Sequence, residues 1–135
     1  MIDREEAAGL VSTMTRDLLR FYDERVPEQG DFPDIRVGKP VHFGDPTITV
    51  PGRIELIVMN MDKRLDPSYD YLRFLSVRVM KSREGGFTSS TCLHGRKKEL
   101  REELEKLAED PSFLVERVEQ LSNGMPEETN PDIWR

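Results

Sequence analysis

The sequence predicts an α+β fold with an N-terminal helix, a central antiparallel β-meander of three to five strands, and a C-terminal helical hairpin. Three observations support this prediction. Apolar residues recur at helical spacing in the first part of the chain, alternating strand patterns are grouped in its middle, and two Leu- or Val-bearing stripes at helical spacing fill the last third. Strands that are grouped together, rather than alternating with helices, favour α+β over a doubly wound parallel sheet.

The N-terminal helix is predicted from one apolar stripe along its length. Asp3 and Glu6 have the spacing of a capping box, which places the start of the helix at Asp3. Val26-Pro27 ends it, because the residue before a proline is pushed out of helical geometry. The stripe consists of Ala7, Leu10, Val11, Met14, Leu18, Phe21 and Tyr22.

The strongest predicted strand covers residues 53–61. Ile54, Leu56 and Val58 fall on one face of it. The other face also carries apolar side chains at Ile57 and Met59, so we expect a central strand that is covered on both sides for part of its length.

The other predicted strands lie on either side of this one in the sequence. Residues 36–43 form an edge strand or an irregular arm, because Gly38 and Pro40 interrupt the pattern, and residues 47–50 are a short β-branched run. In residues 71–81 we expect Ser76 and Arg78 to face water, and residues 87–93 return as the antiparallel partner of that strand.

The last third of the domain is predicted to form two helices. Residues 96–109 carry a narrow stripe of Leu100, Leu104 and Leu107. Asp110-Pro111 breaks this helix and starts the next, whose predicted apolar stripe is Phe113, Leu114, Val118 and Leu121. Residues 1–124 are therefore expected to form a single domain, followed by a tail at 125–135.

Composition excludes several classes of function. The formal net charge is −6 for 135 residues, which argues against a protein that binds a nucleic-acid backbone. The sequence has no apolar run long enough to span a membrane, and its acidic start is unlike a secretory signal. A lone Cys92 cannot close an intramolecular bridge, so we expect the cytoplasm as the compartment.

No catalytic residue, metal site or cofactor is predicted. Cys92 and His94 have strand spacing that would point them the same way, but with His42 they supply too few ligands for zinc, and nothing nearby would activate a nucleophile. A half-buried structural cysteine beside a surface histidine is the preferred interpretation. The acidic residues at 62–70 lack the glycine and closing Glu of a calcium-binding loop.

The segment Phe87–Leu107, FTSSTCLHGRKKELREELEKL, runs from a strand through Gly into a charged helix with regularly spaced Leu residues, and a second helix follows. This order resembles the C-terminal half of many bacterial immunity proteins. Those are the small, acidic, cytosolic partners of polymorphic toxins, including toxins of contact-dependent inhibition systems. The resemblance implies a non-enzymatic protein that neutralises a cognate toxin by direct binding. It transfers no site residue, because this group of proteins shares no invariant site.

Two acidic regions are candidate binding sites for a basic toxin domain. The preferred one is the loop that carries Asp62, Asp66 and Asp70 beside Tyr69, since Tyr is a frequent interface anchor. The other is the polar side of the last helix, with Glu116 and Glu119, which continues into acidic residues of the tail. We expect a monomer or a weak dimer.

Two other classes of function stay open at this point. One is a secretion chaperone or adaptor, which would expose a long apolar groove and form a dimer. The other is a small hydrolase with a site built from dispersed polar residues, including Cys92 and one of the two histidines.

Overall fold

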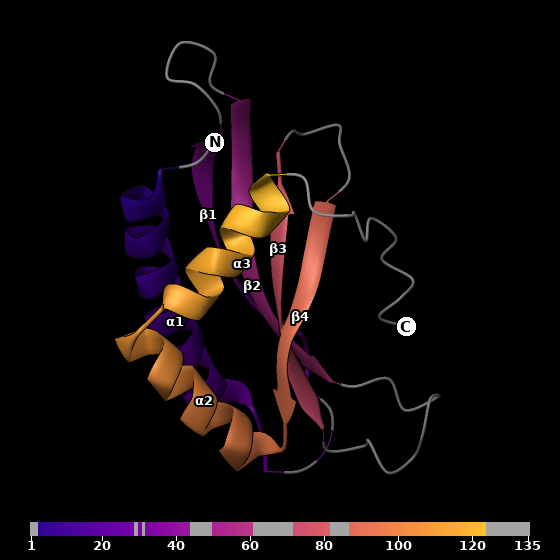
Figure 1. The fold of residues 1–135 in the computed structure, drawn as a ribbon. Helices are drawn as coiled ribbons and strands as arrows, with labels where there is room; N and C mark the ends of the chain where they lie inside the picture. Colours follow the sequence, from indigo (N-terminus) through magenta and orange to yellow (C-terminus); the bar gives the residue numbers. More distant parts are fainter. Residues whose placement is uncertain are drawn as a thin grey trace.

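The computed structural model describes residues 3–28, 30, 32–43, 50–60, 72–81 and 87–123. The predicted α+β fold is confirmed: an N-terminal helix precedes a four-stranded antiparallel sheet, and two helices follow it (Figure 1). In chain order the elements are α1 (Arg4–Arg25), β1 (Ile35–Phe43), β2 (Val50–Asn60), β3 (Arg73–Met80), β4 (Phe87–Gly95), α2 (Lys97–Glu109) and α3 (Ser112–Ser122).

The sheet is a simple meander in which each strand pairs with its neighbours in the sequence, in the order β1-β2-β3-β4. All three pairings are antiparallel, and a typical row across the first three strands is Val37, Leu56 and Val77. One irregularity interrupts the pairing of β3 with β4, where Leu75 pairs with Leu93 and Ser76 pairs with Thr91. Cys92 is therefore the extra residue of a β-bulge.

The three helices pack on one face of the sheet and enclose the main core. α3 crosses this face, and α1 lies beside β1 (Figure 1). On the sheet side the core contains Ile54, Leu56 and Val58 of β2, as the alternation predicts, and all three are fully buried. None of the described helices combines the length and apolar character that a bilayer crossing requires.

The predicted helix ends agree with the structure. Asp3 caps α1 by accepting hydrogen bonds from the backbone N–H groups of Glu5 at 2.8 Å and Glu6 at 3.5 Å. Asp110 similarly accepts a hydrogen bond from the backbone N–H of Ser112 at 3.1 Å, where α3 begins.

Polar contacts connect α1 to α2. The phenol of Tyr22 donates a hydrogen bond of 2.7 Å to the backbone oxygen of Lys97. Asp23 accepts two hydrogen bonds from Arg101, at 2.6 Å and 2.9 Å. This pair lowers the pKa of the Asp23 carboxyl below its usual range, chiefly through the hydrogen bond with Arg101.

Three side chains do not lie where the pattern predicts. Ser76 and Arg78 of β3 were expected to face water, yet Ser76 is buried and only 14% of the Arg78 side chain is exposed. In α3, Phe113 is 38% exposed, and Val115 is buried instead. The alternation of β3 is regular, but Ser76 and Arg78 on its second face are also largely buried, which a sequence pattern does not reveal. The predicted strand residues 47–49 and the predicted tail lie outside the described residues.

Candidate binding surface on the sheet

The preferred acidic loop lies outside the part of the chain that the structure describes. Asp62, Asp66, Tyr69 and Asp70 all belong to residues 61–71.

The second predicted region is described, and its two glutamates differ. Glu116 is exposed on α3 and accepts a hydrogen bond from Nε2 of Gln120 at 3.4 Å. Glu119 forms an ion pair with Arg4 at the start of α1, so its charge is partly used in holding the two helices together. Of these two glutamates, only Glu116 therefore presents a carboxylate that is not paired with a described basic residue.

Cys92 and the histidines do not form a site. The bulge at Cys92 places its thiol against the main core, whereas His94 is exposed and lies opposite Phe74. Burial raises the pKa of the Cys92 thiol to about 11, which is the opposite of what a nucleophile requires. His42 lies in β1, across the sheet from β4. The described residues contain no group of His, Cys, Asp and Glu side chains that could hold a metal ion.

Charge is distributed unequally between the two layers. The four strands carry five basic residues and one acidic residue, whereas the three helices carry nine basic and twelve acidic residues. A chain with a formal net charge of −6 therefore has a sheet of net positive charge. The sheet face that the described helices do not cover is therefore the candidate binding surface.

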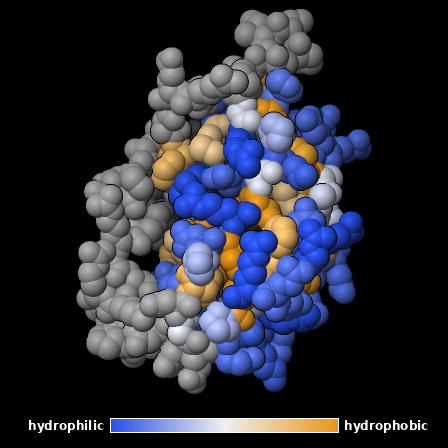
Figure 2. Space-filling view, turned by 180° about the vertical axis from the view of Figure 1, so that it is seen from behind, coloured by the Kyte–Doolittle hydropathy of each residue, from blue (hydrophilic) through white to orange (hydrophobic). Residues whose placement is uncertain are grey.

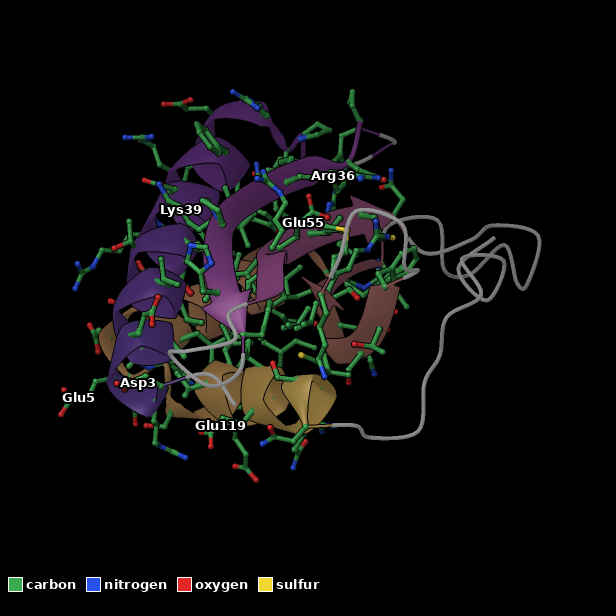
Figure 3. All side chains as sticks on the ribbon, turned by 90° about the horizontal axis from the view of Figure 1, so that it is seen from above. Asp3, Glu5, Arg36, Lys39, Glu55 and Glu119 are labelled. Atoms are coloured by element: carbon green, nitrogen blue, oxygen red, sulfur yellow. The ribbon has the colours of Figure 1, made fainter. Side chains whose placement is uncertain are left out.

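We call this the open face and define it by Arg36 of β1, Arg53 and Glu55 of β2, and Arg78 of β3. The register brings these four residues together, because Gly38, Glu55 and Arg78 form one row and Arg36 and Arg53 lie in the rows on either side of it. Figure 3 shows Arg36 and Glu55 on the side of the sheet away from α3. In Figure 2 strongly hydrophilic residues lie beside apolar ones across this side of the molecule.

Glu55 is the shared carboxylate of the open face. Its Oε2 accepts a hydrogen bond from Nε of Arg53 at 3.3 Å, and its Oε1 lies 3.8 Å from Nη1 of Arg78. Arg36 forms an ion pair of 3.5 Å with Asp34, the residue just before β1. Three guanidinium groups therefore share two carboxylates, and the set keeps an excess of one positive charge.

Arg78 is the buried member of the set. Its Cζ lies 3.8 Å from the centre of the Phe87 ring, so the guanidinium stacks on the aromatic side chain of the neighbouring strand. Its Nε is buried and meets no hydrogen-bond acceptor among the described residues. Burial lowers the pKa of the Arg78 guanidinium, nearby Arg36 lowers it further, and Glu55 opposes the shift.

Arg53 is placed by a glycine of the edge strand. A Cβ at Gly38 would lie 2.6 Å from Nη2 and 2.7 Å from Nε of Arg53, so the guanidinium occupies the space above Gly38. Glycine at this position therefore allows Arg53 to extend from β2 over β1.

A small apolar cluster lies on the same side of the sheet. It consists of Ile57, Met59 and Phe74, which are all buried and separate from the main core. Ile57 pairs with Arg36 on one side and with Ser76 on the other. The charged groups of the open face therefore lie next to a packed apolar base.

Sequence reasoning did not predict the open face as a site. Its residues come from three strands, and only the register shows that they meet. The one signal in the sequence is the alternation Arg53-Ile54-Glu55-Leu56, which puts two opposite charges on the same side of the strongest predicted strand.

Comparisons with known proteins do not assign the chain to a family, so its fold and its open face are the basis for inferring function. No protein-family model matches the chain, and neither a curated protein nor a solved structure is significantly similar to it.

Proposed function

We propose that the protein is a non-enzymatic binding protein of the cytoplasm, and more specifically an immunity protein that neutralises a cognate bacterial toxin by binding it directly. The observation that carries the proposal is the open face: three arginines held in place on a rigid sheet, with no described helix over them. Arginine is enriched at protein–protein interfaces and among the residues that contribute most to binding.

These side chains are held in fixed conformations, which favours binding. Arg53 is fixed by Glu55, and Arg78 is fixed by the Phe87 ring and by Glu55. Side chains that are already ordered lose less conformational entropy when a partner binds. The open face therefore has the character of a preformed protein-binding surface.

The charge of the whole chain supports a basic toxin domain as the partner. At a formal net charge of −6 the protein attracts a basic partner over long distances, which accelerates association. The acidic excess of the helices and the exposed Glu116 contribute to this attraction. The net charge thus acts on the rate of encounter, and the arginines of the open face act in the contact itself.

The proposal is tested by expressing the protein together with a candidate toxin encoded beside it. We expect protection of the cells from that toxin and a complex of the two proteins that survives size-exclusion chromatography. Protection and complex formation are measured for an Arg36→Gln, Arg53→Gln double variant. They are compared with those of an Arg16→Gln, Arg20→Gln variant, which removes two positive charges from α1 instead. Absence of both protection and complex would contradict the proposal.

The same experiment separates the alternatives. A secretion chaperone would form a tight dimer in light scattering and would bind an unfolded export segment without protecting cells. Among the described residues, Phe113 is the one large hydrophobic side chain that is exposed, and it does not form the long apolar groove that this alternative expects. A hydrolase would remove the toxicity by chemically changing a substrate, which mass spectrometry of the products would detect.

A further inference from the structure

We propose that the open face binds a carboxylate on an acidic segment of the partner protein, and that Arg36 and Arg53 hold it. The inference rests on the proposed function only in assigning that segment to the partner. It concerns the chemistry of the contact and follows from the charges, distances and exposure of four side chains.

The first argument is charge complementarity. Arg36, Arg53 and Arg78 share Asp34 and Glu55, so one positive charge of the set is not neutralised by these carboxylates. A single carboxylate from outside would neutralise it. Planar guanidinium groups also match the geometry of a carboxylate, since each can donate two parallel hydrogen bonds to it.

The second argument is accessibility. The side chains of Arg36 and Arg53 are 50% and 48% exposed, whereas those of Arg78 and Glu55 are 14% and 12% exposed. An incoming group therefore meets Arg36 and Arg53 first. Glu55 and Arg78 are less accessible, and Glu55 fixes the position of Arg53 through their hydrogen bond.

The third argument is the spacing of the two accessible groups. The guanidinium of Arg53 lies over Gly38, and Arg36 is the next residue of β1 on the same side, roughly 7 Å along the strand. Two arginine side chains at this separation can both reach one carboxylate placed between them. Arg53 uses its Nε for Glu55, and its two Nη groups make no hydrogen bond to the described residues.

The chain as a whole favours an acidic protein segment over a nucleic acid. The excess positive charge of the set is one unit, and the helical layer is acidic. A nucleic acid gains its affinity by contacting many phosphate-binding positions at once, and a set with one excess positive charge offers few of them. One carboxylate needs only the local pair of arginines.

The test uses the full chain and a short polyglutamate peptide as the probe. A polyglutamine peptide of equal length is the neutral control, and a DNA duplex is the polyanion for comparison. NMR spectra that resolve the arginine Nε–Hε groups report which guanidinium groups respond. We expect polyglutamate to shift the signals of Arg36 and Arg53, polyglutamine to leave them unchanged, and added salt to weaken the effect.

Substitutions provide the second readout. The Arg36→Gln, Arg53→Gln variant should bind polyglutamate about tenfold more weakly than the unsubstituted protein, while the matched Arg16→Gln, Arg20→Gln variant retains its affinity. Thermal unfolding of both variants confirms that each is folded. Equal affinity of the two double variants, or tighter binding of the DNA duplex than of the peptide, would overturn the proposal.

Failure of this inference and failure of the proposed function give different results. Toxin binding that survives the Arg36→Gln, Arg53→Gln substitutions would refute the assignment of the contact and leave the function intact. Polyglutamate binding through Arg36 and Arg53, in a protein that protects against no toxin, would support the carboxylate site and contradict the function.

Discussion

The guanidinium of Arg53 lies in the space that a side chain on Gly38 would occupy. A Cβ at Gly38 would approach Nη2 of Arg53 to 2.6 Å and its Cζ to 2.8 Å. The two residues come from adjacent strands, and Gly38 pairs with Glu55, the residue to which Arg53 is hydrogen-bonded. A glycine that weakens the pattern of an edge strand therefore makes room for the charged set of the open face.

We expect Gly38→Ala to displace Arg53 with little effect on stability. The atoms that the new methyl group meets are at the far end of a flexible side chain, so the side chain can swing away. Loss of the exposed contact with Glu55 costs about 0–1 kcal/mol, and replacing Gly in a strand recovers roughly 0.5–1 kcal/mol. The free energy of unfolding should change little, while polyglutamate binding weakens. Substantial unfolding would show that the backbone, and not Arg53, gives way.

Much of the fold could be predicted from the sequence because local patterns determine it. The apolar stripe of α1, the capping Asp3 and the alternation in residues 53–58 all lead to the observed elements. The strands are joined in sequence order, so the prediction needed no long-range choice of partners. Gly38 and Pro40 indicated an edge strand or an irregular arm, and the structure shows the edge strand.

The open face could not be predicted in the same way. Arg78 follows the alternation that predicts exposure, but the Phe87 ring and the Glu55 carboxylate, both on neighbouring strands, cover it. The bulge at Cys92 likewise depends on how β3 and β4 pair, and it separates two residues that ideal strand spacing places on one side. Both features arise from the register in which neighbouring strands pair. This register cannot be derived from the residue spacing within one segment.

Gly52→Ala should be clearly destabilising, in contrast with Gly38→Ala. A Cβ at Gly52 would lie 2.4 Å from the backbone oxygen of Met80 and 2.4 Å from Cε2 of Phe43. The backbone of a paired strand cannot move aside as an exposed side chain can. We expect a loss of about 1–3 kcal/mol in the free energy of unfolding, measured by chemical denaturation.

Gly9→Ala is the matched control for that measurement. Gly9 lies in the exposed part of α1, and a Cβ there would meet nothing within 4 Å. Alanine should therefore stabilise the protein by roughly 0.5–1 kcal/mol, because it favours the helix. Equal effects of the two substitutions would contradict the packing described at Gly52.

Tyr22→Phe should lower the free energy of unfolding at neutral pH. It should also make this free energy fall less steeply as the pH rises into the alkaline range. The substitution removes the hydrogen bond to the Lys97 backbone oxygen, at a cost of about 1 kcal/mol. Burial raises the pKa of Tyr22 from 10.0 to about 12, with Arg73 opposing the shift. The unfolded chain therefore loses this proton first, so the contribution of Tyr22 is complete below about pH 10 and declines as the pH rises toward 12.

The measurement for Tyr22 is the free energy of unfolding as a function of pH. Cys92 titrates in an overlapping range, so both proteins are compared in a Cys92→Ala background. The curve of the Tyr22→Phe protein should fall less steeply between pH 10 and 12 than that of its parent. Parallel curves would mean that the phenol is as accessible to hydroxide in the folded protein as in the unfolded one.

The thiol of Cys92 should react slowly with alkylating reagents while the protein is folded. Burial raises its pKa to about 11, although Arg117 and a backbone hydrogen bond from Val77 oppose the shift. At pH 8 only about one thiol in a thousand is then ionised, against roughly a quarter in an unfolded chain. Alkylation with iodoacetamide, followed by mass spectrometry, should therefore be more than about 100-fold slower without denaturant than with it. Comparable rates in the two conditions would refute the packing of Cys92 against the core and reopen a chemical role for this strand.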